Sequence, residues 1–232
     1  MKDTLSVVED AIKNHQQIVY ADVNADKIVT LQSDKLIQDY FKEATIVNAD
    51  GQAVIWAAKL FGHQLKERVT GVDLMQKLVE LSANKKYKIY FLGAKEEVVS
   101  TLINKYEKNF GKEIIAGYRN GYFKEEEEKQ IIKDITNSDA NLLFVAITSP
   151  KKEIFLHKHK EALKNINFVM GVGGSFDVHA GFVQRAPIWV QKAGLEWLFR
   201  VYQEPGRMWK RYLISNTKFI ILLFKTYLIE KK

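Results

Sequence analysis

The chain has 232 residues, 47% of them hydrophobic, which is enough to bury one substantial core in a single domain with a small appendage. It contains no cysteine, which excludes disulfide bonds and thiolate metal sites and fits a reducing compartment. Its formal net charge at pH 7 is +7.

The positive charge is concentrated near the C-terminus. Residues 200–232 hold eight Lys and Arg against two acidic residues, so this tail alone carries a net charge of +6. Such a tail implies an anionic partner, and three kinds are compatible with it: nucleic acid, a phospholipid surface or a diphosphate.

Helices and strands are predicted to alternate along most of the chain. The expected order is helix 4–17, strands 18–20 and 27–30, helix 34–42, strand 44–47, helices 53–61 and 74–81, strand 88–92, helix 96–110, strand 114–117, a helix from 125, strand 141–147, a helix from 151, strand 167–170 and helix 192–212.

This alternation predicts an α/β, Rossmann-like fold: a mainly parallel sheet with helices on both faces, plus a helical, basic C-terminal appendage. We expect the α/β domain over residues 1–195 and the appendage over residues 196–232. The carboxyl ends of parallel strands share one edge of a sheet, so polar residues at these ends are expected to converge there.

A glycine-rich turn follows the last predicted strand. The apolar run 168–170 stops at Gly171, Gly173 and Gly174, and Asp177 comes directly after them. Glycine lets backbone N–H groups face a ligand with no Cβ in the way, which is typical of a ligand site at a strand end. The alternative is a tight strand-to-helix turn in which the Asp caps the helix.

Asp50 is a candidate general base. It follows a predicted buried strand and lies between two small residues. A carboxylate beside apolar surface tends toward a raised pKa and can accept a proton. The alternative is that Asp50 caps the next helix. Thr30 and Gln32, at the end of an earlier predicted strand, can reach the same edge of the sheet.

Basic residues mark two further places. Arg68 lies in a polar turn, where the alternative is solvated surface. Lys151, Lys152 and Glu153 open a predicted helix, where backbone N–H groups and ammonium groups can hold an anion. The alternative there is an exposed, charged helix face.

The histidines form no metal motif. His157 and His159 lie two residues apart on a predicted helix and therefore point to different faces, and His179 stands apart from them. We therefore expect no metal site. The phosphate-binding loop of nucleoside triphosphatases, the dinucleotide fingerprint and the nucleophile elbow are also missing from the sequence.

The tail has the pattern of a helix at a membrane surface. Residues 197–202 carry an apolar stripe, and the apolar run 219–224 is interrupted by Lys225. We expect no segment to reach the roughly 18 apolar residues of a membrane span. Aromatic and lysine residues around a short apolar run suit the headgroup region. The alternative is a soluble helix that packs on the domain or on a partner subunit of a homo-oligomer.

Taken together, these motifs resemble those of a known family, the WecG/TagA/CpsF glycosyltransferases, also called glycosyltransferase family 26. The resemblance covers residues 28–213 and is most specific over residues 171–207. The matching motifs are Asn48–Gly51, Arg68–Leu74, Phe91–Ala94, Gly121–Phe123, Gly171–Asp177, Ala180-Gly181, Arg185–Pro187, Gly194–Trp197 and Glu204-Pro205.

The resemblance implies an inverting, metal-independent and UDP-sugar-dependent hexosyltransferase. Such an enzyme needs no cofactor and moves a sugar, N-acetylmannosamine-like or another hexose, to a sugar on polyprenyl diphosphate. Teichoic acid, capsule and exopolysaccharide are made in this way. The resemblance further implies a peripheral enzyme at the cytoplasmic face of the membrane.

The resemblance also implies roles for residues. The catalytic set is Asp50 as base, with Thr30 near it and Arg68 tied to activity. The UDP-sugar is expected at Gly93, Lys152, Gly171, Gly173, Gly174 and Asp177. The lipid diphosphate is expected at Arg200, Arg207 and Arg211.

Two positions depart from the family pattern. Gln32 stands where the family often has Asn, and Lys152 stands where it often has Gln. A lysine replaces a neutral amide donor with a cation, which leaves the identity of the donor sugar open.

A different class of function competes with this interpretation: a non-enzymatic, Rossmann-like module that binds nucleotide or nucleic acid through its basic tail. Such a module would bind DNA or RNA with salt-sensitive affinity and would turn over no UDP-sugar. The apolar residues of the tail form aliphatic runs rather than spaced stacking aromatics, so we expect no nucleic-acid partner.

Overall fold

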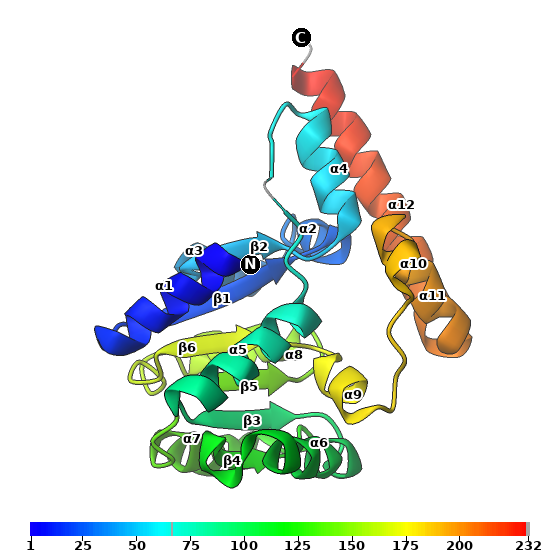
Figure 1. The fold of residues 1–232 in the computed structure, drawn as a ribbon. Coiled ribbons are helices and arrows are strands. Elements are labelled where there is room, and N and C mark those ends of the chain that lie inside the picture. Colours follow the sequence, from blue (N-terminus) through cyan, green and yellow to red (C-terminus); the bar gives the residue numbers. More distant parts are fainter. Residues whose placement is uncertain (66, 231–232) are drawn as a thin grey trace. The chain divides into compact units, whose positions relative to one another are not determined.

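The computed structural model describes residues 1–65 and 67–230, with the side chains of Arg207 and Glu230 outside the description. The chain gathers into two compact units (Figure 1). Unit 1 comprises residues 1–21, 36–47 and 71–183, and unit 2 comprises residues 22–35, 48–70 and 184–232. The domain boundary at residue 195 stays a prediction, since compact units defined by contacts need not be folding domains.

The elements follow one another in an alternating order, as the sequence predicts. They are α1 (Lys2–Lys13), β1 (Ile18–Val23), α2 (Ala25–Thr30), α3 (Lys35–Glu43), β2 (Ile46–Ala49), α4 (Gln52–Leu60), α5 (Gly71–Lys85), β3 (Ile89–Gly93), α6 (Glu96–Phe110), η1 (Lys112–Ile114), β4 (Ile115–Arg119), η2 (Glu125–Glu127), α7 (Glu128–Thr136), β5 (Leu142–Ala146), α8 (Lys151–Lys158), β6 (Phe168–Gly171), α9 (Ser175–Ala180), α10 (Ile188–Lys192), α11 (Glu196–Gln203) and α12 (Pro205–Glu230).

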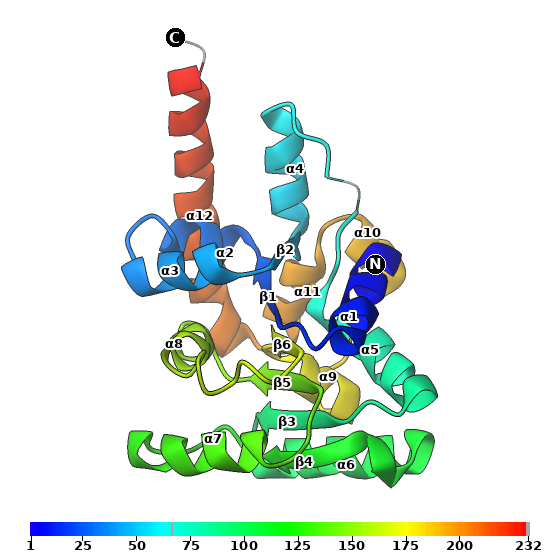
Figure 2. The same ribbon diagram turned by 90° about the vertical axis from the view of Figure 1, so that its left-hand side faces the viewer.

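The strands form one parallel sheet in the order β2-β1-β6-β5-β3-β4. In unit 1, α1, α5 and α6 lie on one side of the sheet and α3, α7 and α8 on the other (Figures 1 and 2). The predicted α/β, Rossmann-like fold is therefore confirmed. The last two residues of β1 and of β2 extend into unit 2.

Both faces of the central strands are buried, which is why these strands are apolar throughout rather than alternating. On β3, Tyr90 and Leu92 share a core cluster with Ile131 of α7. Phe91, which points to the other face, packs on Tyr106 of α6 with 5.8 Å between ring centroids.

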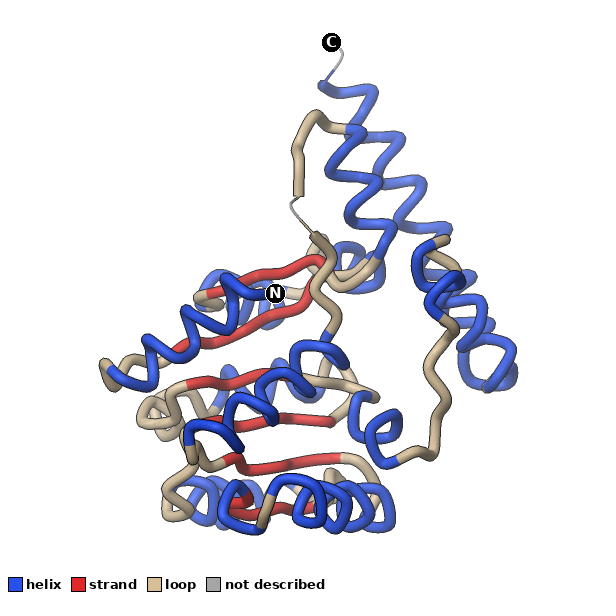
Figure 3. The backbone as a smooth tube through the Cα atoms, in the orientation of Figure 1, coloured by secondary structure: helices blue, strands red, loops and turns tan. Residues whose placement is uncertain are grey.

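Unit 2 is mostly helical (Figure 3). Its apolar contacts centre on a cluster of Ala25 from α2, Ala57 from α4 and Phe219 from α12. The partly buried Ala53 and Leu223 pack against this cluster. The small side chain of Ala25 lets α12 approach α2 closely.

The predicted strand over residues 27–30 is wrong, because these residues belong to helix α2. The side-chain oxygen of Asn24 caps this helix by accepting a hydrogen bond from the backbone N–H of Lys27 at 3.0 Å. Ile28 and Val29 pack against the cluster of unit 2. The cap and this packing decide the conformation of a run whose β-branched residues favour a strand.

The C-terminal tail differs from expectation in length. The predicted break is confirmed, since α11 ends at Gln203 and α12 begins at Pro205. However, α12 continues without a break to Glu230. Among the described residues, Met208–Ile229 is long and apolar enough to cross a membrane, judged by length and composition. The expectation that no segment reaches that length is therefore wrong, because apolar residues are spread along the whole helix.

Candidate active site

Asp50 lies in the short connection between β2 and α4, within unit 2. Its backbone N–H donates to the carbonyl oxygen of Val23 at 3.0 Å, which continues the pairing of the edge strand β2 with β1 by one residue. The N-cap residue of α4 is Gly51. The alternative in which Asp50 caps this helix is therefore wrong.

The carboxyl group of Asp50 is half-buried, and burial raises its pKa above the ordinary value of 3.8. The carboxylate of Asp22 raises this pKa further by repulsion. The positive charges of Arg68, Arg200 and Lys27 act in the opposite direction. The net shift is upward, so Asp50 binds a proton more tightly than a solvated carboxylate does, as a general base must.

Arg68 is fixed at both ends of its guanidinium group. Its Nε donates to the main-chain oxygen of Asp50 at 2.6 Å, and its Nη2 pairs with Glu196 of α11. Arg200, one turn further along α11, places Nη2 3.6 Å from the other oxygen of Glu196. Glu196 therefore links two arginines beside the candidate base, and the alternative of a solvated Arg68 is wrong.

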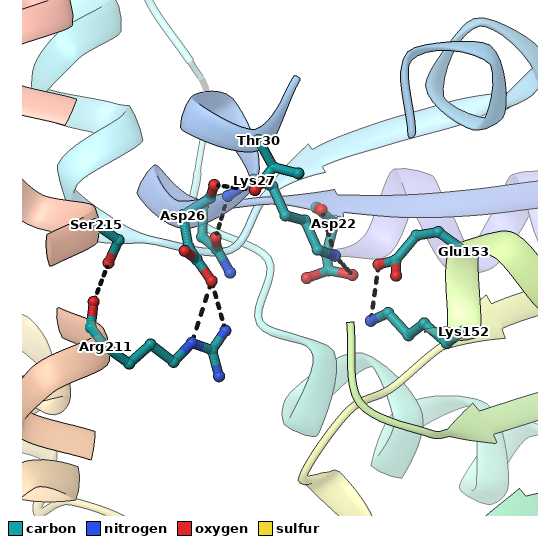
Figure 4. A network of polar contacts seen from close by, with 9 residues as sticks. Asp22, Asp26, Lys27, Thr30, Lys152, Glu153, Arg211 and Ser215 are labelled. Carbon is teal, nitrogen blue, oxygen red and sulfur yellow. Dashed lines mark hydrogen bonds and ion pairs between the residues drawn. The ribbon is translucent and has the colours of Figure 1, made fainter. Parts of the chain in front are cut away.

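Asp22 and Lys27 form a second charged pair in this part of unit 2 (Figure 4). The Lys27 ammonium donates to Oδ1 of Asp22 at 2.7 Å and to its carbonyl oxygen at 2.9 Å. Lys27 is only 7% exposed. The sequence analysis missed this pair. Asp22 is the next-to-last residue of β1, and Asp50 directly follows β2.

Thr30 lies at the end of helix α2 rather than at the end of a strand. Its hydroxyl donates to the carbonyl oxygen of Asp26 at 3.0 Å, one turn earlier in the helix (Figure 4). Gln32 similarly donates to the carbonyl oxygen of Ile28 at 3.1 Å. The predicted position of Thr30 is wrong, and its part in catalysis stays a prediction.

Arg211 joins α12 to α2. Its Nε and Nη2 both donate to Oδ2 of Asp26, at 3.1 and 2.7 Å (Figure 4). The side chains are largely exposed, so this pair stabilises the fold by at most about 1 kcal/mol. Arg211 and Arg200 are thus both paired with carboxylates, whereas the side chain of Arg207 lies outside the described part. Diphosphate binding by the three stays a prediction.

In unit 1, Lys152 and Glu153 open helix α8 and are 4% and 1% exposed. The Lys152 ammonium lies 3.6 Å from Oε1 of Glu153 (Figure 4). The interpretation of this segment as an exposed charged face is therefore wrong for these two residues. A Cβ added to Gly171 would lie 2.8 Å from Cδ of Lys152, so this glycine makes room for the buried lysine.

The other predicted donor-site glycines have different surroundings. A Cβ on Gly93 would lie 2.5 Å from the backbone of Ala146, and the φ of Gly93 is +134°, so close approach of β5 requires glycine there. Gly173 and Gly174 have nothing within 4 Å of an added Cβ. Asp177 lies in α9 and is half-buried.

Metal ligands do not gather in the described part of the chain: it contains no group of three or more His, Cys, Asp or Glu placed to hold a metal ion. His157 and His159, for example, contact Glu43 and Glu128 separately, at 3.0 and 2.8 Å. The expected metal independence of the reaction stays a prediction.

The structure brings Asp50, Arg68 and Arg200 together in unit 2, and Lys152 and Gly171 together in unit 1. Asp22, Lys27 and Glu196 join the first group. Only Glu196 could have been found from the sequence, because it belongs to one of the matching motifs, Gly194–Trp197.

Comparison with known proteins gives consistent results. The model of the Glycosyl transferase WecG/TagA/CpsF family matches residues 1–232. An N-acetylglucosaminyldiphosphoundecaprenol N-acetyl-beta-D-mannosaminyltransferase of Bacillus spizizenii is 31% identical over 221 residues, covering 91% of this chain and 84% of the relative. A protein of the same name from Bacillus subtilis strain 168 is 30% identical over 207 residues, covering 89% and 79%.

Proposed function

Because the chain belongs to the WecG/TagA/CpsF glycosyl transferase family, we propose that it transfers a hexose from a UDP-sugar to a sugar on polyprenyl diphosphate. The names of the two relatives support an N-acetylmannosamine unit and an N-acetylglucosaminyl diphosphate lipid. The product would enter a cell-wall polymer such as teichoic acid. The observation that carries the proposal is the match of residues 1–232 to the model of this family, and the position of Asp50 beside a fixed Arg68 supports the candidate base.

In the proposed reaction, Asp50 takes the proton from the acceptor hydroxyl group. The hydroxyl oxygen attacks the anomeric carbon from the side opposite to UDP, and the bond between this carbon and the phosphate oxygen breaks. Its electron pair leaves with UDP, so the configuration at the anomeric carbon inverts. The proton then passes from Asp50 to solvent, which restores the base.

Two groups of residues would neutralise the negative charges of the UDP leaving group and of the lipid diphosphate. In unit 1, the buried Lys152 and the turn from Gly171 to Asp177 would hold the donor and its leaving group. In unit 2, Arg200, Arg207 and Arg211 would meet the lipid diphosphate. Arg200 and Arg211 are each paired with a carboxylate, that of Glu196 and that of Asp26, and a diphosphate can take the place of these carboxylates. We propose that these cations and backbone N–H groups do this without a metal ion.

The substrate and α12 support a position at the membrane, and we propose a peripheral one on the cytoplasmic face. The first half of α12 carries the Arg211–Asp26 ion pair, which would be costly inside the hydrocarbon core. Only residues 220–230 extend past the buried Phe219, about 16 Å of helix against a core of about 30 Å. Basic residues in this helix would add attraction to an anionic leaflet.

The test is an assay of UDP release with a panel of UDP-sugars and a short-chain polyprenyl diphosphate carrying N-acetylglucosamine. One active donor, with turnover unchanged by EDTA, is the expected result. Turnover that needs an added divalent ion would contradict metal independence alone. The absence of turnover with every donor, together with salt-sensitive binding to DNA or RNA, would favour the non-enzymatic alternative.

A further inference from the structure

Helix α4 exposes large apolar side chains outside the apolar cluster of unit 2, although the edge of the Trp56 ring packs against Gly194. Trp56 and Leu60 are 56% and 53% exposed. They lie four residues apart and therefore on one face of the helix. Val54 and Ala57, which are buried, lie on the neighbouring face, and Ala57 belongs to the cluster of unit 2. Leu65, in the loop that follows, is 44% exposed.

Helix α12 lies beside α4. Like α4, it has buried side chains on one part of its surface and exposed apolar side chains on another. Phe219 of α12 is buried in one cluster with Ala57 of α4 and Ala25 of α2. Figures 1 and 2 both draw α4 next to the second half of α12. Ile220 and Phe224 of α12 are exposed.

Lysines accompany the exposed apolar residues on both helices. Lys59 lies on α4, and Lys218 and Lys225 lie on α12, and all three are exposed. No acidic residue lies between Gln52 and Leu65, and none lies between Pro205 and Ile229. Tryptophan and lysine beside exposed aliphatic residues suit the boundary between acyl chains and anionic headgroups.

We propose that residues 52–65, which comprise α4 and the first residues after it, are a second membrane-contacting element, which meets an anionic phospholipid surface together with α12. This inference rests on the proposed function, because that function brings the enzyme to a lipid-linked acceptor. It adds that the membrane is contacted by two adjacent helices far apart in the sequence. A helix pair also resists rolling on the surface, which a single helix does not.

Contact of α4 with lipid would also limit the distance between the candidate base, Asp50, and the membrane surface. Asp50 lies two residues before the start of α4. Trp56 and Leu60 follow the first residue of this helix by about 6 and 12 Å along its axis. Contact of these side chains with lipid therefore holds Asp50 within about three helical turns of the bilayer, whatever the tilt of α4. A diphosphate at the level of the headgroups lies within that range, so Trp56 and Leu60 act as positioning residues.

The chain lacks cysteine, so single labels are easy to place. In Leu60→Cys, an environment-sensitive fluorophore is attached at position 60. Its emission should shift to the blue when phosphatidylglycerol vesicles are added, and spin-labelled lipid should quench it. Ile220→Cys on α12 should do the same. Lys112→Cys, on an 84% exposed side chain in unit 1, should do neither.

A label at position 60 that stays in water while position 220 responds would overturn the proposal. A shift that appears without vesicles and grows with protein concentration would also overturn it, in favour of a second copy of the chain.

A kinetic measurement separates this inference from the proposed function. Trp56→Ser with Leu60→Ser should lower turnover of a long-chain acceptor in vesicles about 10-fold more than turnover of a short-chain acceptor in solution. Leu36→Ser, which removes an exposed apolar side chain from α3, should affect both acceptors equally. Equal losses in the double variant would overturn the positioning role. If the unmodified enzyme used neither acceptor, the proposed function itself would fail, whereas the label experiment would still report on α4.

Discussion

Nε of Arg68 donates to the main-chain oxygen of Asp50 at 2.6 Å, so the arginine and the candidate base are joined through the backbone. The same guanidinium group pairs with Glu196. This arrangement holds a positive charge near the carboxylate of Asp50 and lowers its pKa without overcoming the effect of burial.

Asp50→Asn should lower kcat about 10²- to 10⁴-fold, because an amide cannot accept the proton of the acceptor hydroxyl. Binding of UDP should stay within about twofold, measured by calorimetry. Asp10→Asn, which changes an exposed carboxylate on α1, is the matched control and should leave kcat unchanged. Full turnover in Asp50→Asn would remove the assignment of the base.

The raised pKa of Asp50 should also be visible in stability. Below its ordinary pKa of 3.8 the group is neutral in both states and has no effect. As pH rises from there through the higher folded pKa, the unfolded state ionises first and the native protein loses stability. Asp50→Asn should therefore have a higher Tm than the unmodified protein at pH 7.5, and the difference should shrink as pH falls. A constant difference in Tm would contradict the shift.

Arg68 offers a matched pair of substitutions. Arg68→Gln removes the charge that lowers the pKa of Asp50, so the acidic limb of the pH–kcat profile should move to higher pH. Arg68→Lys keeps the charge but cannot contact both Asp50 and Glu196, so the limb should stay in place while kcat falls about 10- to 100-fold. Identical profiles for the two variants would show that the charge of Arg68 does not act on Asp50.

Two glycines of unit 1 should respond differently to alanine. Gly93→Ala should lower the free energy of unfolding by about 2 kcal/mol or more, because the Cβ meets the backbone of Ala146 at a positive φ. Gly174→Ala has open space and a φ of −78°, so it should change this free energy by about 0.5 kcal/mol or less. Urea denaturation measures both, and equal losses would contradict the packing described here.

Membrane binding should depend on the exposed face of α12. The double variant Ile220→Ser, Phe224→Ser should weaken co-sedimentation with phosphatidylglycerol vesicles about 10-fold or more. Both side chains are exposed and lie outside the buried core, so they are available to contact lipid. The Tm should change little for the same reason. Raising the salt concentration should weaken binding of the unmodified protein as well. Unchanged sedimentation of the double variant would contradict contact through this face.

Much of the fold was predictable because local pattern and tertiary packing agree over most of the chain. The parallel sheet follows from apolar strands that alternate with amphipathic helices, and Asp50 was identified from its place after such a strand. The short segment at 27–30 was not predictable, since Asn24 and the packing of Ile28 and Val29 override its preference for a strand. The full length of α12 was also missed, because its apolar residues are not contiguous.

By itself, the sequence determined the order of the elements, the family motifs and the basic tail, because these depend on residue types and on spacing along the chain. Only the tertiary structure decided that Lys152 is buried against Gly171, that Glu196 links Arg68 to Arg200, and that Asp22 adds to the pKa shift of Asp50. Burial and charge interactions depend on distances through space between segments that lie up to 128 residues apart, and no local pattern records those distances.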